Sequence, residues 1–107
     1  MIRSATDFAK LQQEGRSRVH PLLLVRYRRN DLDRTRYGIS TTRRIGSAVV
    51  RNRLRRQLRT LLRQFDPRLI TGWDVLIVAR GAAVGVHQGE LESALAQLFA
   101  GARLLKS

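Results

Sequence analysis

The sequence predicts an α+β fold, in which helices pack on a small, mostly antiparallel sheet. Three observations predict it: segments with helical spacing of apolar residues, segments with strand-like alternation, and one unbroken apolar run. The chain has 107 residues, of which 43% are hydrophobic. That length suits a single domain, residues 1–107, with a modest core. The segments follow in the order α-β-β-α-β-α.

The first half of the chain predicts one helix and two strands. The helix begins at Thr6–Asp7 and ends before Gly15, a residue suited to a helix C-terminus. The apolar and then alternating run at 19–29 predicts the first strand, and residues 37–42 predict the second. Turn-forming residues occupy 30–33. We therefore expect the two strands to pair as a hairpin.

The second half predicts two helices around a central strand. Ser47 is suited to the N-cap of a helix over 48–65. Residues 73–80 contain the unbroken run VLIVA, which is typical of a strand buried on both faces and central in its sheet. A glycine-rich connection leads to a last helix over 90–104. Its predicted core stripe is Leu91, Leu95, Leu98, Phe99 and Ala102.

Positive charge is concentrated in one third of the chain. There are 21 Lys and Arg against 8 Asp and Glu. Residues 34–65 hold ten arginines and no acidic residue, whereas residues 66–107 hold four charges of each sign. Such a cluster gains affinity for polyanions by releasing their counterions, and the guanidinium fork suits phosphate. A genomic bias toward Arg codons explains part of the Arg excess, but not the missing acids.

On a helical wheel, the 48–65 helix is cationic around one narrow apolar stripe, which is formed by Val50, Leu54, Leu58, Leu61 and Phe65. Like charges four residues apart, such as Arg55 and Arg59, repel each other by about 0.2–0.5 kcal/mol. A merely solvated helix face normally alternates acidic with basic residues, and this one does not. We infer that a bound polyanion relieves the repulsion.

Composition excludes several other classes. The chain has no cysteine, which rules out disulfides and Cys-ligated metals. The longest stretch without a charged residue, 93–102, is too short to cross a bilayer, and residues 1–15 lack the apolar core of a signal peptide. We therefore expect a cytoplasmic protein with no membrane partner. The acidic residues are scattered and His20 and His87 are isolated, so we expect neither catalytic nor metal-ligating residues.

Strand alternation predicts a groove on one face of the sheet. If the two first strands pair, cations and small hydroxyl-bearing residues lie side by side, which suits single-stranded nucleic acid. Phe8 at the groove's edge could stack on a base, and the alternative is core packing against Leu11. The groove-facing residues are Leu24, Arg26 and Arg28 of the first strand and Gly38, Ser40 and Thr42 of the second.

The segment YGISTTRRIGSAVVRNRLRRQLR, residues 37–59, resembles the signature of the bacterial ribonuclease P protein component. The shared parts are a Gly-Ile-Ser strand, a basic pair, a glycine, an Ala-Val pair and an Arg-Asn-Arg motif with a basic continuation. The upstream residues Asp7, Phe8 and Gly15 and the downstream strand WDVLIVAR extend the resemblance over nearly the whole chain.

This resemblance implies a subunit of an RNA–protein endoribonuclease that removes the 5′ leader of precursor tRNA by hydrolysis, with the chemistry performed by a catalytic RNA and its bound Mg²⁺. It implies no catalytic residue on this chain, and we expect no obligate protein partner. The resemblance and the charge pattern together imply that the catalytic RNA is bound by Arg43, Arg44, Arg51, Asn52, Arg53, Arg55, Arg56, Arg59 and Arg63. The resemblance assigns the leader to a cleft formed by Phe8, Gln12, Leu24, Arg26, Arg28, Ser40 and Thr42.

The resemblance also implies a ribosomal-protein-like fold in which the β-α-β crossover around the Arg-rich helix is left-handed, against the usual right hand. Three positions depart from the family pattern. Gln12 and Arg26 stand where many members carry aromatic residues, and Arg3 is the only cation where the family usually has a basic arm. We therefore expect a leader contact with fewer stacked bases and more charge.

Two other interpretations stay open at this point. A ribosomal or other structural RNA-binding protein accounts for the charge, but not for the full series of motifs. A DNA-binding helix-turn-helix protein predicts a short helix directly before the 48–65 helix, where we expect a β-hairpin.

Overall fold

The computed structural model describes residues 5–106, and of residues 5–8 and 12 it describes the backbone only. The predicted α+β class is confirmed. None of the described helices is long and apolar enough to traverse a bilayer. In chain order the elements are α1 Ala5–Glu14, β1 Arg16–Val19, β2 Leu23–Arg29, β3 Arg36–Ser40, η1 Arg43–Ile45, α2 Ala48–Phe65, η2 Asp66–Arg68, β4 Trp73–Ala79, η3 Gly81–Ala83 and α3 Gln88–Gly101, where η marks a single 3₁₀ turn.

The predicted strand over 19–29 is in fact the end of one strand and the whole of another. β1 and β2 are joined by a tight turn, in which the backbone N–H of His20 donates to the carbonyl of Leu23 at 2.8 Å. The N–H of Leu22 donates to Nδ1 of His20 at 3.1 Å. All four residues of β1 are exposed. The sequence of β1 therefore has no buried-face alternation by which it could have been predicted.

The four strands form one sheet in the order β1-β2-β4-β3. β4 pairs antiparallel with β2 and parallel with β3, and it is central, as its apolar run predicts. The expected hairpin between β2 and β3 is wrong, because β4 lies between them. β4 is the strand with an apolar surface on both faces, so it takes the position where both faces and both edges are covered.

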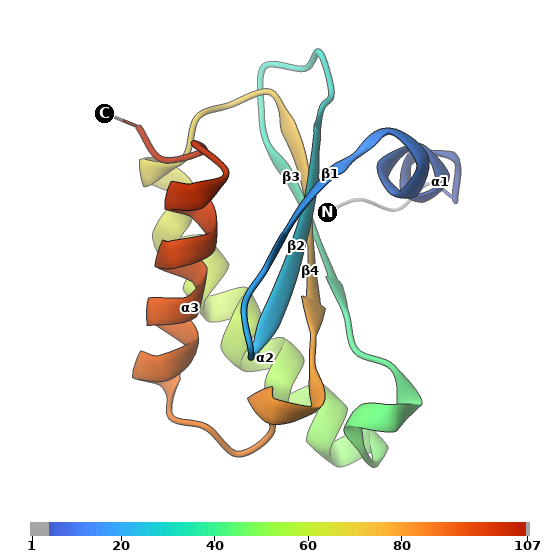
Figure 1. Ribbon diagram of the computed structural model, residues 1–107, viewed down its shortest axis with the longest axis vertical. Helices are drawn as coiled ribbons and strands as arrows, with labels where there is room; N and C mark the ends of the chain where they lie inside the picture. The colour runs from blue at the N-terminus through green and yellow to red at the C-terminus, as the bar shows by residue number, and fades with distance from the viewer. Residues whose placement is uncertain (1–4, 107) are drawn as a thin grey trace.

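The β3–α2–β4 crossover is left-handed. Figure 1 views the sheet nearly edge-on: β3 runs downward behind β4, α2 returns upward on the left, and β4 then runs downward in front of β3. This path is the opposite of the hand that strand twist normally favours. The left-handed crossover implied by the family resemblance is confirmed. A strand and a single 3₁₀ turn precede α2, which does not fit the helix-turn-helix interpretation.

The sheet has helices on both faces, but unequally. α2 and α3 cover one face, and α1 lies against the other (Figure 1). The main core lies under α2 and α3, where Phe65 and Phe99 meet edge to face with their ring centroids 5.4 Å apart. On the second face Leu11 of α1 packs with Leu76 and Val78 in a much smaller cluster. Part of the second face is therefore left uncovered.

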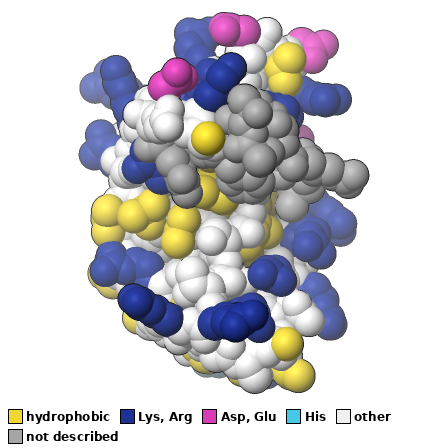
Figure 2. Space-filling model, turned by 90° about the vertical axis from the view of Figure 1, so that its right-hand side faces the viewer, with side chains coloured by type: hydrophobic (Ala, Val, Ile, Leu, Met, Phe, Trp, Pro, Cys, Tyr) yellow, Lys and Arg dark blue, Asp and Glu magenta, His cyan; other side chains and the backbone are white. Residues whose placement is uncertain are grey.

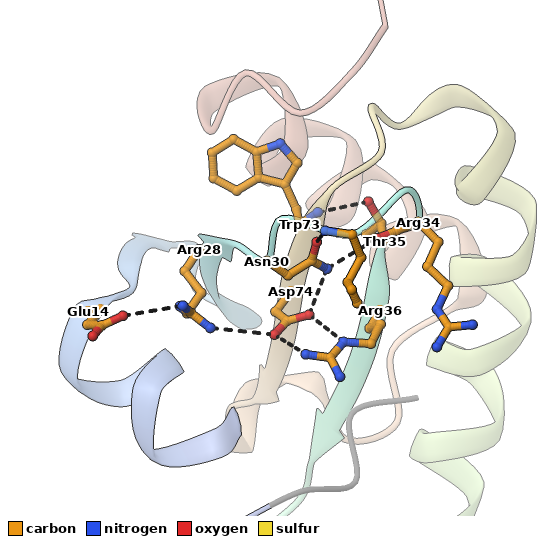
Figure 3. A network of polar contacts seen from close by, with 9 residues as sticks. Glu14, Arg28, Asn30, Arg34, Thr35, Arg36, Trp73 and Asp74 are labelled. Atoms are coloured by element: carbon orange, nitrogen blue, oxygen red, sulfur yellow. Dashed lines mark hydrogen bonds and ion pairs between the residues drawn. The ribbon is translucent and has the colours of Figure 1, made fainter. Parts of the chain in front are cut away.

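A buried carboxylate holds one end of this second face together. The side chain of Asp74 on β4 is fully buried, and Arg36 donates hydrogen bonds to its Oδ1 at 2.8 Å and its Oδ2 at 2.7 Å. Asn30 donates to Oδ1 at 2.9 Å, and the guanidinium of Arg28 lies 3.9 Å from Oδ2 and 3.4 Å from Glu14 (Figure 3). Burial raises the pKa of Asp74, but the hydrogen bonds and charges of these neighbours outweigh it and hold the pKa below its usual range.

We predict that Asp74→Asn lowers the free energy of unfolding by about 3–5 kcal/mol, because it removes the buried charge with which Arg36 and Arg28 pair. Urea unfolding followed through the fluorescence of the adjacent Trp73 measures this loss. Since the folded-state pKa of Asp74 lies below the unfolded one, its stabilisation is present above the unfolded pKa and is lost as the pH falls through the folded pKa. Wild type therefore loses more stability in acid than the variant does.

The matched control is Asp33→Asn, which removes an exposed carboxylate from the turn before β3. Its free energy of unfolding should stay within about 0.5 kcal/mol of wild type. An equal loss in the two variants would show that the ion pair is not what stabilises this end of the sheet.

Candidate nucleic-acid interface

Eight arginines gather on α2 and on the turn before it. Ser47 caps the helix by accepting a hydrogen bond from the N–H of Val50 at 3.4 Å. The apolar stripe faces the core as predicted, with Leu54, Leu58 and Phe65 buried. Most of the cations are exposed, and Arg51 and Arg55 are partly buried at the edge of the stripe. We call this set the arginine surface: Arg43, Arg44, Arg51, Asn52, Arg53, Arg55, Arg56, Arg59 and Arg63.

The charge of the arginine surface is not neutralised within the described part of the chain. None of its arginines makes an ion pair there; the ion pairs that form involve Arg28 and Arg36. Arg55 donates to Oδ1 of Asn52 at 3.5 Å. Nε of Arg51 is buried and has no hydrogen-bond acceptor among the described residues. A buried charged donor without an acceptor is unfavourable, so the surface is suited to acceptors supplied from outside, such as phosphates.

The second candidate surface is the face of the sheet toward α1, which we call the open face: Leu24, Arg26 and Arg28 of β2, Leu76 and Val78 of β4, and Gly38 and Ser40 of β3. The expectation that Arg26 and Arg28 lie directly beside the small residues of β3 is wrong. The pairing register places Leu76 between Arg26 and Gly38, and Val78 between Leu24 and Ser40. The inserted β4 therefore gives the predicted groove an apolar floor.

Contacts within the protein engage both cations predicted for the groove. The guanidinium of Arg26 donates to the carbonyl of Leu11 at 3.2 Å and to that of Gly15 at 3.2 Å, and also to the hydroxyl of Ser17 at 2.8 Å. It thereby caps the C-terminal end of α1 and fixes it to the sheet. Arg28 pairs with Glu14 and Asp74. Both arginines position α1 over the open face.

The remaining groove residues divide into those the structure describes and those it does not. Leu24 and Ser40 are partly buried on the open face, and Thr42 is exposed at the start of η1. The side chains of Phe8 and Gln12 lie outside the described residues. Val19 is not among the residues predicted for the groove. It pairs with Leu24 on the open face, and 61% of it is exposed.

Figure 2 looks onto the open face. Hydrophobic side chains gather beside and below the undescribed residues, Lys and Arg side chains line the lower and lateral edges, and Asp and Glu lie toward the upper end. The α2 part of the arginine surface lies on the opposite, helix-covered side of the sheet, whereas η1, which carries Arg43 and Arg44, lies at the lower end on the side of the open face (Figure 1). The molecule thus carries two distinct surfaces. Among the described residues no three His, Asp or Glu side chains are grouped so that they could hold a metal ion.

The fold and these two surfaces define a small arginine-rich α+β domain with a cationic helix on one side and a partly apolar sheet face on the other. The sequence model of the Ribonuclease P family matches residues 1–103. The ribonuclease P protein component of Thermoanaerobacter sp. strain X514 is 34% identical over 98 residues, which cover 92% of this chain and 84% of that protein. This chain belongs to the ribonuclease P protein family.

Solved structures agree with this assignment. The RNase P protein from Thermotoga maritima is 28% identical and superposes with a TM-score of 0.84, over 91% of this chain and 94% of that chain. A Staphylococcus aureus RNase P protein, at 24% identity, shares the fold with a TM-score of 0.89 over 98% of this chain and 96% of that chain.

We predict that Arg26→Met loosens α1 without unfolding the sheet. The variant loses the charged hydrogen bonds to the carbonyls of Leu11 and Gly15, each worth about 1.5–3 kcal/mol. Amide hydrogen exchange should therefore be at least about tenfold faster near the C-terminal end of α1, with β4 unchanged. Arg16→Met, which removes an exposed arginine from β1, is the control and should leave α1 as it is. Equal exchange in the two variants would contradict the capping role.

We further predict that Arg56→Ala and Arg59→Ala each weaken binding to ribonuclease P RNA and make its salt dependence shallower by about one unit. Each variant removes one phosphate contact and so one released counterion. The measurement is log Kd against log salt concentration. Lys106→Ala removes an equal charge near the C-terminus and should leave the slope unchanged. Slopes for Arg56→Ala and Arg59→Ala equal to wild type would place both residues outside the interface.

Proposed function

We propose that this chain is the protein subunit of ribonuclease P and helps a catalytic RNA to remove the 5′ leader of precursor tRNA. In this proposal the arginine surface binds the catalytic RNA, and the open face holds the leader. The observation that carries the proposal is the arginine surface itself, whose charge no described carboxylate neutralises, in a chain that belongs to the ribonuclease P family.

The arginine surface is suited to a folded RNA rather than to a small anion. Its exposed cations extend along the whole of α2, from Arg53 to Arg63, so they meet phosphates over several helical turns. Arg51 at the edge of the surface has a buried Nε without a described acceptor, which a phosphate oxygen would satisfy. Binding would also relieve the repulsion between arginines on successive turns.

The open face is suited to a single-stranded segment. The partly buried Leu24 and Val78 of its apolar floor offer surface to unstacked bases, and the hydroxyls of Ser40 and Thr42 offer hydrogen bonds. Arg26 and Arg28 contribute positive potential from positions that α1 and Asp74 fix. We expect the leader to run along this floor, with Phe8 and Gln12 of α1 at its edge.

The Mg²⁺ needed for hydrolysis is expected on the RNA. The described carboxylates on this chain do not fit a magnesium site: they form no cluster, and both oxygens of the buried Asp74 accept hydrogen bonds from Arg36. We therefore assign no step of the reaction to a carboxylate of this chain. Its contribution to Mg²⁺ dependence would be electrostatic, since it lowers the repulsion between RNA segments that Mg²⁺ otherwise has to screen.

The deciding experiment adds the purified chain to a ribonuclease P catalytic RNA and follows leader removal from precursor tRNA at subsaturating Mg²⁺. We expect faster cleavage with the protein, and a gain that shrinks as Mg²⁺ is raised. No gain at any Mg²⁺ concentration would overturn the proposal.

Precursor tRNAs with leaders of different length distinguish the contribution of the open face from that of the arginine surface. With wild type, precursor tRNA carrying a leader of several nucleotides should bind the holoenzyme more tightly than precursor carrying one nucleotide. Ser40→Glu, which places a negative charge on the open face, should reduce this difference and leave affinity for the catalytic RNA unchanged. The double variant Arg56→Ala/Arg59→Ala should lower the affinity for the catalytic RNA and leave the effect of leader length unchanged. The same response in both variants would contradict the assignment of two separate surfaces.

A further inference from the structure

A hollow of about 340 Å³ lies between the edge strand β3 and α2. Tyr37 and Ile39 line it from β3, and Thr35 lines it from the residue before that strand. Arg59, Leu62 and Arg63 line it from α2, with Asp66 at the end of the helix. Its volume is at the lower end of the roughly 300–1,000 Å³ of small-ligand pockets. The hollow lies on the α2 side of the sheet, away from the open face proposed for the leader.

The polar groups of the hollow are held in place. The hydroxyl of Tyr37 donates to Oδ1 of Asp66 at 2.5 Å. Thr35 donates to the carbonyl of Ile70 at 2.8 Å and accepts from the N–H of Trp73 at 3.3 Å, so its hydroxyl is satisfied by the backbone. Burial and the hydrogen bond to Asp66 raise the pKa of Tyr37, so its hydroxyl keeps the proton that it donates.

Asp66 is unusual for its position. It is the first acidic residue after the acid-free segment 34–65, and it lies between arginines on a surface that would meet phosphates. It makes no described ion pair with Arg59 or Arg63, and it accepts from Tyr37 instead. Its Oδ2 has no described partner. Asp66 is exposed, and its carboxylate would repel a phosphate, so it can contact an RNA only through a group that donates hydrogen bonds.

We propose that this hollow binds an unpaired guanosine of an RNA, with the base in the hollow and its phosphate on Arg59 and Arg63. Among the four RNA bases only guanine presents two adjacent N–H donors, N1–H and N2–H, on its Watson–Crick edge. A carboxylate accepts such a pair and offers no donor, and one Tyr37 hydrogen bond leaves acceptor sites on both oxygens. Ile39 and half-exposed Tyr37 supply the apolar wall that an unstacked base requires.

This inference deepens the proposed function, because it adds a base-specific contact to an RNA-binding surface. Arg59 and Arg63 bind any phosphate and so raise affinity without regard to sequence. Asp66 discriminates between bases, and Tyr37 is a positioning residue that orients its carboxylate. A single unpaired guanosine at the right place in a folded RNA would then fix the register of the arginine surface on that RNA.

The test titrates the isolated full-length chain with GMP, AMP, CMP and UMP and follows backbone amide NMR signals. We expect saturable shifts for Tyr37, Ile39, Leu62 and Arg63, and binding of GMP at least about tenfold tighter than that of the other three. Asp66→Asn replaces one acceptor oxygen by a donor at the same volume and should abolish the preference for GMP. Arg63→Gln should weaken all four nucleotides alike and leave the preference intact.

Asp33→Asn, which removes a carboxylate outside the hollow, is the matched control and should bind the four nucleotides as wild type does. Tyr37→Phe keeps the ring and loses the hydroxyl, so it should reduce the preference for GMP while the nucleotide-induced shifts persist. Equal affinities for the four nucleotides, or shifts that avoid the hollow, would overturn the inference.

The nucleotide titration tests the guanosine site independently of the cleavage assay. If the chain accelerates leader removal but shows no preference for GMP, the hollow is not a guanosine site and the proposed function stands. If the chain prefers GMP through Asp66 but gives no gain in cleavage with the catalytic RNA, the site stands and the proposed function is wrong.

Discussion

Strand β4 is apolar on both of its faces, and both faces therefore have to be covered. Val75 and Ile77 pack under α2 and α3, while Leu76 and Val78 face α1. A strand with these properties is stable only in the interior of the sheet, so β2 and β3 pair on its two sides. The apolar floor of the open face and the exposed edge of β3 follow from this placement.

The central strand also separates the two surfaces that we propose for RNA binding. Because side chains alternate between the faces of a sheet, the same few strands present an apolar core toward α2 and the open face toward α1. The exposed arginines of α2 then lie on one side of the sheet, and the open face lies on the other. This arrangement underlies the proposal that one small domain holds two RNA segments on opposite sides of its sheet.

The cations of the chain differ in what balances them. Arg26, Arg28 and Arg36 lie on the sheet, where partial burial demands partners, and carbonyls or Asp74 supply them. The arginines of α2 are mostly exposed, so water screens their repulsion and the fold tolerates it at small cost. The arginines that stabilise the sheet are therefore already paired within the protein. The arginines of α2 make no described ion pair and are available to a binding partner. Asp66, between these arginines and bound by Tyr37, is the exception that gives this surface a chemical preference beyond charge.

The sequence by itself determined the α+β class, α2 with its apolar stripe and arginines, and the central position of β4, because these depend on periodicity and composition within one segment. The handedness followed from the family resemblance. Tertiary structure alone decided that β4 separates β2 from β3, that β1 is a strand, and that Arg26 caps α1. It also brought Tyr37 to Asp66. These features depend on groups far apart in the chain, and no local pattern records which of several possible partners a strand edge or a guanidinium will meet.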